Sequence, residues 1–248
     1  MAEREPHPYK RRPVFHWAAL FCFIAGGIAL AAWHLMTHPD TPLPREWNPR
    51  QALDVRDPVT PLTAWKLARA LRDDAACLAA IDTGAGAQRK PDFVDTPRCG
   101  IAPQITLSSA AGATLAPFNT RCQTALRLAM WTQHGLQPAA REIFGQDIAR
   151  IEHFSSYSCR AIRTTAGTDT RMSSHATADA IDVSAFVLVD GTGISLLHDW
   201  NGAAQKAAFL RRANRTACDW FPLTLGPEYN SLHADHFHLQ NSGFSLCR

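Results

Sequence analysis

Two short segments of the sequence contain residue types that can bind a catalytic metal ion. Residues 173–183, SSHATADAIDV, place His175 and Asp182 seven positions apart in a run of small and apolar residues. Residues 233–240, HADHFHLQ, contain three histidines within six positions. A catalytic zinc ion takes three protein ligands from His, Asp, Glu or Cys and keeps its fourth position for water. The two segments together therefore offer the ligands of such a site.

The spacing of His175 and Asp182 indicates a loop followed by a strand. Neighbours on one face of a helix are three or four positions apart, and this pair does not have that spacing. The apolar residues around Asp182 are typical of the start of a strand. The small residues Ala176, Ala178 and Ala180 would let this backbone pass close to the metal ion.

The third ligand is expected from the histidine-rich segment. Side chains alternate between the two faces of a strand, so His236 and His238 should point to the same face. One of them can bind the metal ion while the other faces the substrate beside it. His233, at a bend before the strand, can reach the same cleft from its rim.

Both segments also have plain structural interpretations. A histidine and an aspartate at this spacing occur together by chance, and three histidines near a C-terminus can form a surface patch. Their conjunction in one domain favours the metal site. His134, His153 and His198 have no such partners in the sequence, so we expect structural or surface roles for them.

Several helices and strands must position these residues. Periodic apolar residues predict a helix that starts near Leu62, and GAGAQRKPD, residues 84–92, breaks it. The other predicted elements are a helix at 120–134 that Gly135 ends, a strand at 148–160, a hairpin at 180–197, a helix at 202–216 and a final strand at 236–240. Strands with separate helices, without regular βαβ alternation, predict an α+β domain.

The N-terminus contains a predicted transmembrane anchor at residues 14–36. Residues 14–33 carry no formal charge, and as a helix they would span roughly 30 Å, the thickness of a bilayer's hydrocarbon core. The basic cluster at 10–12 lies in segment 1–13, so the positive-inside rule predicts a cytoplasmic N-terminus and export of the rest. A cleaved signal peptide is the alternative, because residues 29–31 could form a small-residue cleavage site.

The rest of the chain has the composition of an exported protein. Residues 37–61 are rich in proline and predict an extended stalk, which leaves residues 62–248 as the exported domain. Cys22 lies in the apolar span, and an even number of cysteines follows it, which a disulfide-permissive compartment allows. These six are Cys77, Cys99, Cys122, Cys159, Cys218 and Cys247. Their pairing is open at this stage, and buried free thiols are the alternative.

Composition and missing motifs exclude several classes of function. The formal net charge of +3 is small, and no basic patch or finger-like Cys/His spacing points to a nucleic-acid partner. The sequence has neither H-E-x-x-H nor G-x-S-x-G, which disfavours thermolysin-like proteases and serine hydrolases.

The two segments resemble motifs of known zinc peptidases. SSHATADAID is similar to the S-x-H-x-x-G-x-A-x-D pattern of the group that contains D-Ala-D-Ala carboxypeptidases, lysostaphin and hedgehog domains, and HFH matches their H-x-H. The spacing of the three histidines looks most like that of murein endopeptidases. A closer resemblance, over roughly residues 90–248, is to the bacterial extensin-like C-terminal family through SSYSCR, AIDV, FLR, LGPEYN and HADHFHLQ.

The resemblance implies a small antiparallel sheet with flanking helices, as in hedgehog and D-Ala-D-Ala-peptidase domains. It also implies Zn2+ held by His175, Asp182 and His238, with peptidoglycan peptides as the substrate class. Two positions depart from the pattern. Ala178 replaces its glycine and loses the freedom to adopt a positive φ, and Ser174 stands where the family often has an acid. Neither departure removes a ligand.

For such a peptidase, zinc would supply hydroxide at neutral pH. We expect His236 to act as the base and His233 to stabilise the oxyanion or share the proton transfer. Arg171 or Arg160 would contact a substrate carboxylate or the oxyanion, and a solvated surface charge is the alternative for each. Asp235 is expected to accept a histidine N–H.

The leading hypothesis is a single-pass protein of the bacterial inner membrane whose periplasmic domain is a zinc peptidase that acts on peptidoglycan peptides. The alternative is a non-catalytic cell-wall binding or scaffolding module that retains the zinc site. A disulfide-rich structural protein without a metal ion is the third hypothesis.

Overall fold

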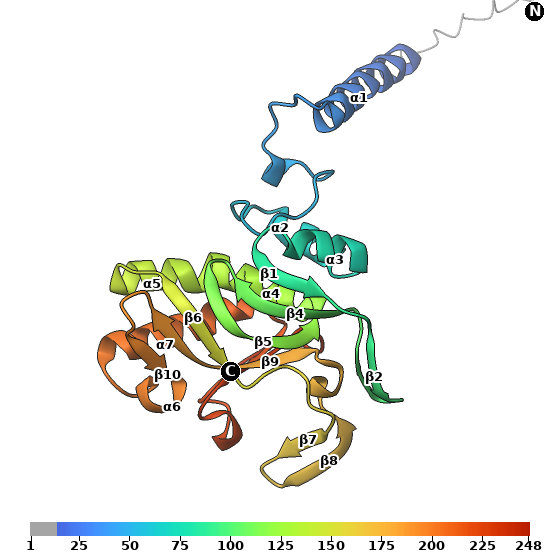
Figure 1. Cartoon of the computed structure of the whole chain (residues 1–248). Helices are drawn as coiled ribbons and strands as arrows, with labels where there is room; N and C mark the ends of the chain where they lie inside the picture. Colours follow the sequence, from blue (N-terminus) through green and yellow to red (C-terminus); the bar gives the residue numbers. More distant parts are fainter. Residues whose placement is uncertain (1–13) are drawn as a thin grey trace, which may run out of the picture. The chain divides into compact units, whose positions relative to one another are not determined.

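The apolar N-terminal run forms one long helix, α1 (Val14–Thr37). The structure, a computed structural model, describes residues 14–248 (Figure 1). The predicted cytoplasmic segment 1–13 lies outside the described residues. Residues His16–Thr37 contain an 18-residue window with a mean hydropathy of 1.9 and are long and apolar enough to cross a membrane, a test that a signal sequence also passes. The helix is therefore compatible with a single-pass anchor.

The chain divides into two units, residues 1–51 and residues 52–248. The first unit contains α1 and the first part of the proline-rich segment 37–61, and the rest of that segment belongs to the second unit. The second unit begins ten residues before the predicted domain start at residue 62, because Leu53 and Val55 are buried in its core.

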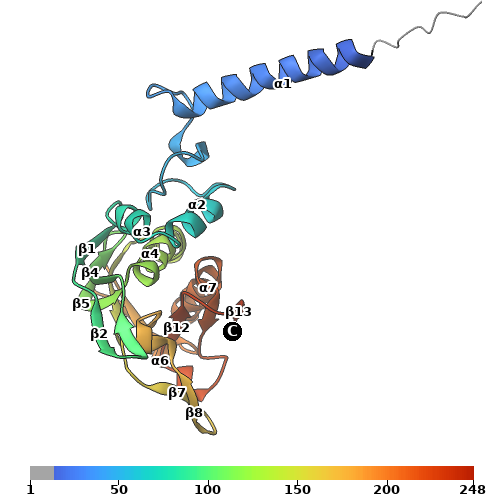
Figure 2. The same cartoon turned by 90° about the vertical axis from the view of Figure 1, so that its right-hand side faces the viewer.

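A nine-stranded sheet forms the centre of the second unit (Figures 1 and 2). The strand order is β1-β4-β5-β6-β9-β12-β11-β13, with β10 paired to β9. Most neighbours are antiparallel, but β5–β6 and β11–β13 are parallel. The bounds are β1 (Ala85–Arg89), β4 (Gln104–Ala110), β5 (Ala113–Arg121), β6 (Ile148–His153), β9 (Ala180–Leu188), β10 (Gly193–Ser195), β11 (Leu223–Leu225), β12 (Phe237–Gln240) and β13 (Leu246–Cys247). The domain is α+β as predicted. The prediction of a small antiparallel sheet is wrong, because the sheet has nine strands and contains two parallel pairs.

Two short hairpins extend from this sheet, β2 (Phe93–Thr96) with β3 (Cys99–Ile101), and β7 (Ala161–Thr164) with β8 (Gly167–Met172). The α-helices of the second unit are α2 (Thr63–Ala70), α3 (Asp74–Ile81), α4 (Cys122–Trp131), α5 (Gln137–Phe144), α6 (Leu196–Asp199) and α7 (Ala204–Trp220). Short 3-10 helices lie at Arg45–Trp47, Ser174–Thr177 and Ser231–His233, and a π-helical turn lies at Thr132–Leu136.

Helices α4 and α7 cover one face of the sheet (Figure 2). Trp131 of α4 is buried and makes edge-to-face contacts with Phe186 of β9 and Phe237 of β12. Phe209 of α7 packs edge-to-face on the same Phe186. Such aromatic pairs contribute about 0.5–1.5 kcal/mol beyond the area that they bury. The core therefore lies between these helices and the sheet, and the opposite face of β9 and β12 is available for polar residues.

A β-bulge in β9 lets residues before and after it pack into the same core. Val183 pairs with His153 and Ala185 pairs with Glu152, so Ser184 is the extra residue. A bulge inserts one residue and reverses the alternation of side chains beyond it. As a result both Val183 and Phe186, three positions apart, are fully buried.

Several element boundaries differ from those predicted. The helix predicted at 120–134 does not end at Gly135, because α4 continues through the π-helical turn into α5 and ends at Gly145, whose φ is 68°. Residues 84–92, predicted as a break, contain β1, and the strand predicted at 148–160 ends at His153. The hairpin at 180–197 is confirmed as β9 and β10, and the helix predicted at 202–216 extends to Trp220.

The six cysteines of the second unit form three disulfides. They are Cys77–Cys122, Cys99–Cys159 and Cys218–Cys247. The first joins α3 to α4, the second joins β3 to the loop before β7, and the third joins α7 to β13. The predicted disulfides are confirmed, and their pairing agrees with a chain that folds in an oxidising compartment.

Candidate metal centre

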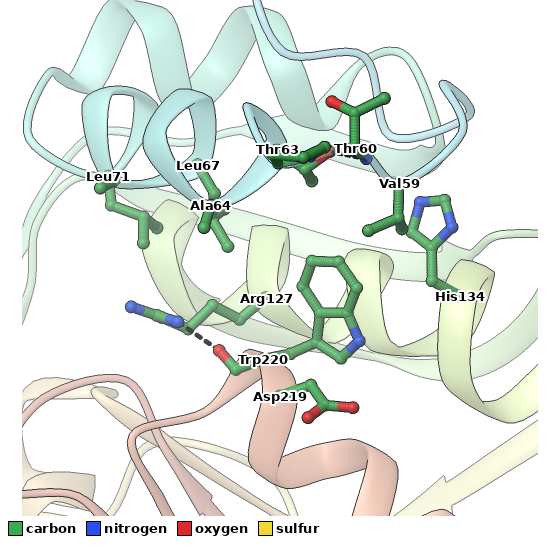
Figure 3. A pocket seen from close by; sticks show the side chains of 12 residues that line it. Val59, Thr60, Thr63, Ala64, Leu67, Leu71, Arg127, His134, Asp219 and Trp220 are labelled. Carbon is green, nitrogen blue, oxygen red and sulfur yellow. Dashed lines mark hydrogen bonds between the residues drawn. The ribbon is translucent and has the colours of Figure 1, made fainter. Parts of the chain in front are cut away.

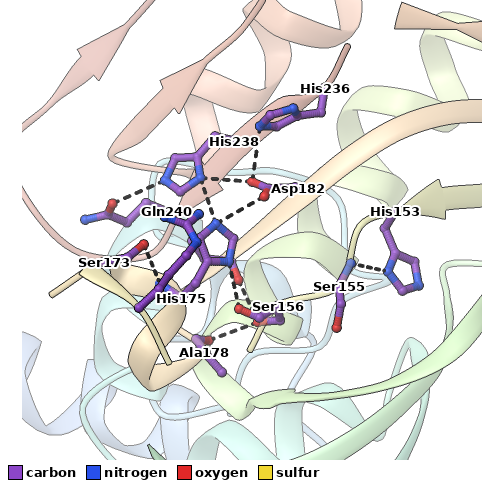
Figure 4. Close-up of polar contacts among 12 residues, drawn as sticks. His153, Ser155, Ser156, Ser173, His175, Ala178, Asp182, His236, His238 and Gln240 are labelled. Carbon is purple, nitrogen blue, oxygen red and sulfur yellow. Dashed lines mark hydrogen bonds and ion pairs between the residues drawn. The ribbon is translucent and has the colours of Figure 1, made fainter. Parts of the chain in front are cut away.

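The structure brings His175, Asp182 and His238 together, and their ligand atoms lie within 4.8 Å of one another (Figure 4). The Nε2 atom of His175 is 3.1 Å from Nδ1 of His238 and 3.2 Å from Oδ2 of Asp182. The Nδ1 atom of His238 is 2.9 Å from Oδ1 of Asp182. These are the three ligands that the resemblance implied.

Strand pairing explains why two of these side chains meet. In the antiparallel pair β9–β12, Asp182 lies directly opposite His238. Ile181 and Val183 on one strand, and Phe237 on the other, are buried in the core. Because side chains alternate along a strand, Asp182 and His238 both point away from the core.

His175 reaches the same point from the 3-10 helix at Ser174–Thr177. The hydroxyl of Ser173 accepts the amide N–H of His175 and caps this helix. The backbone of Ser173 and His175 is also tied to residues on either side of the Cys99–Cys159 disulfide, by hydrogen bonds to Arg160 and Ser158. The loop that was predicted to carry the first ligand is therefore anchored.

Hydrogen bonds outside the cluster determine which ring nitrogen of His175 and of His238 faces the cluster. Nδ1 of His175 is 2.8 Å from the carbonyl oxygen of Ser156, which can only accept, so Nδ1 carries the proton and Nε2 faces the cluster. Nε2 of His238 is 3.4 Å from Oε1 of Gln240, which leaves Nδ1 facing the cluster. Metal-binding histidines are usually oriented in this way by a partner of the second ring nitrogen.

These donors fit a zinc ion. Bonds of about 2.0–2.1 Å in tetrahedral geometry place two ligand nitrogens about 3.3 Å apart. The separation between the facing nitrogens of His175 and His238, 3.1 Å, is close to this value. Two imidazoles and one carboxylate leave one position open in a tetrahedron, which is the pattern of catalytic rather than structural zinc sites.

Asp182 is ionised in this environment. Burial by itself raises the pKa of its carboxyl, but hydrogen bonds and charge interactions with His175 and His238 outweigh burial and hold the pKa far below its usual range. The carboxylate therefore supplies a negative charge to the cluster at neutral pH.

His236 lies beside the three ligands. Its Nε2 atom is 3.6 Å from Oδ1 of Asp182, and its Nδ1 atom is 2.7 Å from Oδ1 of Asp235. The ring also packs edge-to-face on Phe154. The same-face prediction for His236 and His238 agrees with this geometry, and Asp235 accepts a histidine N–H as expected.

His233 lies next to the same group, with ring centroids 5.2 Å from His236 and 5.9 Å from His238. Its Nδ1 atom is 2.7 Å from Oδ1 of Asn230, an oxygen that also accepts the amide N–H of Leu232. Burial, and then the charges of His238 and His236, lower the pKa of His233 to about 4. Its imidazole is therefore neutral at pH near 7, with Nε2 as an acceptor.

His233, His236 and His238 line a cleft of about 660 Å³, whose lining also includes three arginines, Arg160, Arg163 and Arg171. Arg171, predicted to contact substrate, is largely exposed and forms a two-nitrogen contact with Asp169 at 2.7 and 2.9 Å. Within the described part of the chain, Arg160 and Arg163 have no carboxylate within ion-pair distance. The lining of the cleft therefore combines histidines with cationic side chains.

The network around Asp179 was not predicted from the sequence. This buried carboxylate accepts hydrogen bonds from Arg121, Asn241 and Ser242. It lies between His175 and Asp182 in the sequence and links the 3-10 helix to the end of β12. An acidic residue among alanines, in a segment otherwise small and apolar, was the signal for it.

The other three histidines have the structural or surface roles that were expected. His134 donates its Nε2 N–H to the carbonyl of Val55 and stacks on Trp220, and His153 donates its Nε2 N–H to the carbonyl of Ala116. His198 is exposed.

Comparison with known proteins gives one family. No curated protein and no solved structure is similar to this chain at a significant level. The model of the family described as extensin-like protein C-terminus matches residues 75–248, well over half of the chain, and includes every residue of the cluster. This chain therefore belongs to the extensin-like C-terminal family.

Proposed function

We propose that the second unit is a zinc-dependent peptidase that acts on peptidoglycan peptides in the bacterial periplasm. The observation that carries the proposal is the conjunction of a three-ligand cluster, with its histidine tautomers oriented for metal binding, and a histidine–carboxylate pair at its edge. A likeness to hedgehog and D-Ala-D-Ala-peptidase domains belongs to this proposal and rests on the sequence motifs.

His175, Asp182 and His238 would hold the ion. When bound, zinc supplies a water nucleophile at neutral pH and polarises the substrate carbonyl. The protein's contribution to this chemistry is to orient both imidazoles through the carbonyl of Ser156 and the amide of Gln240.

His236 is the residue that we assign to proton transfer. Its Nδ1 N–H donates to Asp235, so Nε2 is free to accept a proton in the cleft. The Asp235 carboxylate would stabilise the resulting imidazolium, as an acid partner does in other histidine-dependent hydrolases. The base can then return this proton to the leaving amine.

His233 suits a different role from the one predicted from the sequence. A neutral ring whose Nδ1 donates to Asn230 has no N–H on Nε2 to offer an oxyanion. It can instead accept an N–H from the substrate or orient a water molecule at the rim of the cleft.

The three arginines of the cleft agree with an anionic substrate. Peptidoglycan peptides carry free carboxylates, and a guanidinium binds a carboxylate through two parallel hydrogen bonds. Arg160 and Arg163 are the better candidates because Arg171 is already engaged by Asp169.

The proposed location follows from α1, the basic cluster that precedes it in the sequence, and the three disulfides. The positive-inside rule orients the helix with a cytoplasmic N-terminus. A single-pass anchor in the inner membrane would then place the second unit in the periplasm.

The test uses the purified full-length chain in detergent. Zinc content is measured by elemental analysis, and release of soluble fragments from purified peptidoglycan is followed by chromatography. The variants are His175→Ala, His236→Gln and, as a matched control on an exposed histidine, His198→Gln.

A peptidase requires zinc in the wild type, His198→Gln and His236→Gln, and none in His175→Ala. It also requires fragment release by the wild type and His198→Gln, at least a hundredfold slower release by His236→Gln and none by His175→Ala. Zinc binding without cleavage by any form would favour a non-catalytic wall-binding module, and a wild type that takes up no zinc would contradict the metal site.

A further inference from the structure

A second cavity, of about 610 Å³, lies between α2, α4 and the end of α7 (Figure 3). Its walls are mainly apolar, with Val59, Leu67, Leu71 and Trp220 among them. The volume is within the range of small-molecule sites, about 300–1,000 Å³. No residue of the metal cluster lines this cavity, so ligand binding here would not depend on the proposed peptidase activity.

One partly buried cation, Arg127 of α4, lines this apolar pocket and extends beneath α2 (Figure 3). Its Nε donates to Oδ1 of Asn241 at 2.6 Å, and one terminal nitrogen donates to the carbonyl of Trp220. Among the residues that the structure describes, no carboxylate lies within ion-pair distance of Arg127. A guanidinium has five N–H groups, so these two contacts leave donors for a ligand.

The remaining titratable groups of the lining do not neutralise this charge. Burial lowers the pKa of Arg127 to about 10 although the charge of Asp179, which lies outside the lining, opposes this, so the side chain stays charged at neutral pH. Asp219 is exposed to solvent, where its charge is screened. Burial also lowers the pKa of His134, so this ring is neutral. The pocket therefore combines apolar walls with a single, incompletely satisfied positive charge.

We propose that this pocket binds a small amphiphilic carboxylate. The carboxylate would accept the free N–H groups of Arg127, and the apolar body would lie against Leu67 and Leu71 of α2. A ligand without an acceptor group would leave the free N–H groups of the guanidinium unpaired, and a small hydrophilic anion would leave the apolar walls uncovered. Charge and shape thus select the same class of ligand.

The test measures binding of hexanoate and of its uncharged analogue hexanamide by equilibrium dialysis. The protein is the full-length chain in lipid nanodiscs, and empty nanodiscs give the background. Arg127→Gln removes the charge, and Ala64→Trp fills the pocket from an exposed position on α2. Arg69→Gln is the matched control, because this arginine of α2 lies over Trp65 and outside the pocket lining.

Hexanoate should bind saturably to the wild type and to Arg69→Gln, and hexanamide at least about tenfold more weakly. Both pocket variants should weaken hexanoate binding by at least tenfold. Arg127→Gln also removes two internal hydrogen bonds, so Ala64→Trp is the deciding variant. Absence of saturable hexanoate binding to the wild type, equal affinity for hexanamide, or unchanged binding by Ala64→Trp would each overturn the proposal.

Discussion

At the scale of single residues, the metal cluster depends on groups that do not touch the metal position. The carbonyl of Ser156 and the side chain of Gln240 decide which nitrogen of His175 and of His238 faces the cluster. A ligand in the wrong tautomer would present an N–H where a lone pair is needed. Substitution of such a partner therefore tests the proposed metal site while all three ligands remain.

Replacement of Gln240 by leucine should weaken zinc binding by about ten- to a hundredfold, because it removes the acceptor that orients His238 while all three ligands remain. Competition with a fluorescent chelator measures this affinity. Gln88→Leu, on an exposed position of β1, is the control. Equal zinc affinities for Gln240→Leu and the wild type would show that Gln240 does not orient the ligand.

Ala178 keeps the positive φ that its replacement of a glycine was expected to disfavour. It is strained, because it adopts φ 50° as the C-cap of the 3-10 helix that carries His175. A left-handed conformation costs a residue with a Cβ atom about 1–2 kcal/mol. Ala178→Gly relieves this strain but loses a buried methyl group, and we expect the free energy of unfolding to change by less than about 0.5 kcal/mol. Ala176→Gly, also fully buried but without positive φ, should cost about 1–2 kcal/mol. Urea titration compares the two, and equal losses would contradict the strain.

At the scale of elements, close approach between helices explains Gly135, which was predicted from the sequence to end a helix. Gly135 lies in the π-helical turn, where an added Cβ would be 2.8 Å from both Oγ1 of Thr216 on α7 and Cδ1 of Trp131. Neither neighbour is the free end of a flexible chain, since Trp131 is fully buried and its Nε1 donates to Thr216. The glycine thus permits contact between α4 and α7.

Gly135→Ala should therefore destabilise the protein by about 1–3 kcal/mol, even though alanine is the better helix former by about 1 kcal/mol. Gly193→Ala, where an added Cβ meets no atom within 4 Å, should be nearly neutral. The midpoints of thermal unfolding of the full-length chain measure both changes. A stabilised Gly135→Ala variant would mean that the turn can relax away from α7.

At the scale of the whole molecule, two histidines outside the cluster make stability depend on pH. Burial lowers the pKa of both His134 and His153, although hydrogen bonds to backbone carbonyls partly oppose this. In the unfolded chain each takes up a proton near pH 6.5, whereas in the folded chain each does so only at lower pH. Their contribution to stability is therefore complete above about pH 6.5 and is lost as the pH falls through the lower pKa of the folded state.

The free energy of unfolding should therefore fall between about pH 7.5 and about pH 5.5. Urea titrations with a chelator present exclude the effect of metal release. The His134→Gln/His153→Gln variant should lose less stability over this interval, while His198→Gln, at an exposed position, should behave like the wild type. An identical loss in the double variant would assign the pH dependence to other groups.

The sequence by itself determined which two segments contribute to the candidate metal cluster and the character of the elements around it. The alternation of side chains in HFHLQ was sufficient to place His236 and His238 on one face, and twenty uncharged residues were sufficient to predict α1. The even number of cysteines was sufficient to predict disulfides. These properties are local, since each depends on residue type and on a repeat of two or of about 3.6 positions.

The tertiary structure alone decided the rest, because it depends on contacts between residues far apart in the chain. The pairing of β9 with β12 sets Asp182 opposite His238, and the bulge at Ser184 lets that register coexist with a buried Phe186. The partner of Nδ1 of His175 is a carbonyl nineteen positions away, which no spacing rule predicts. The π-helical turn at Gly135 likewise arises from packing against α7, where steric fit outweighs the local preference of glycine to end a helix.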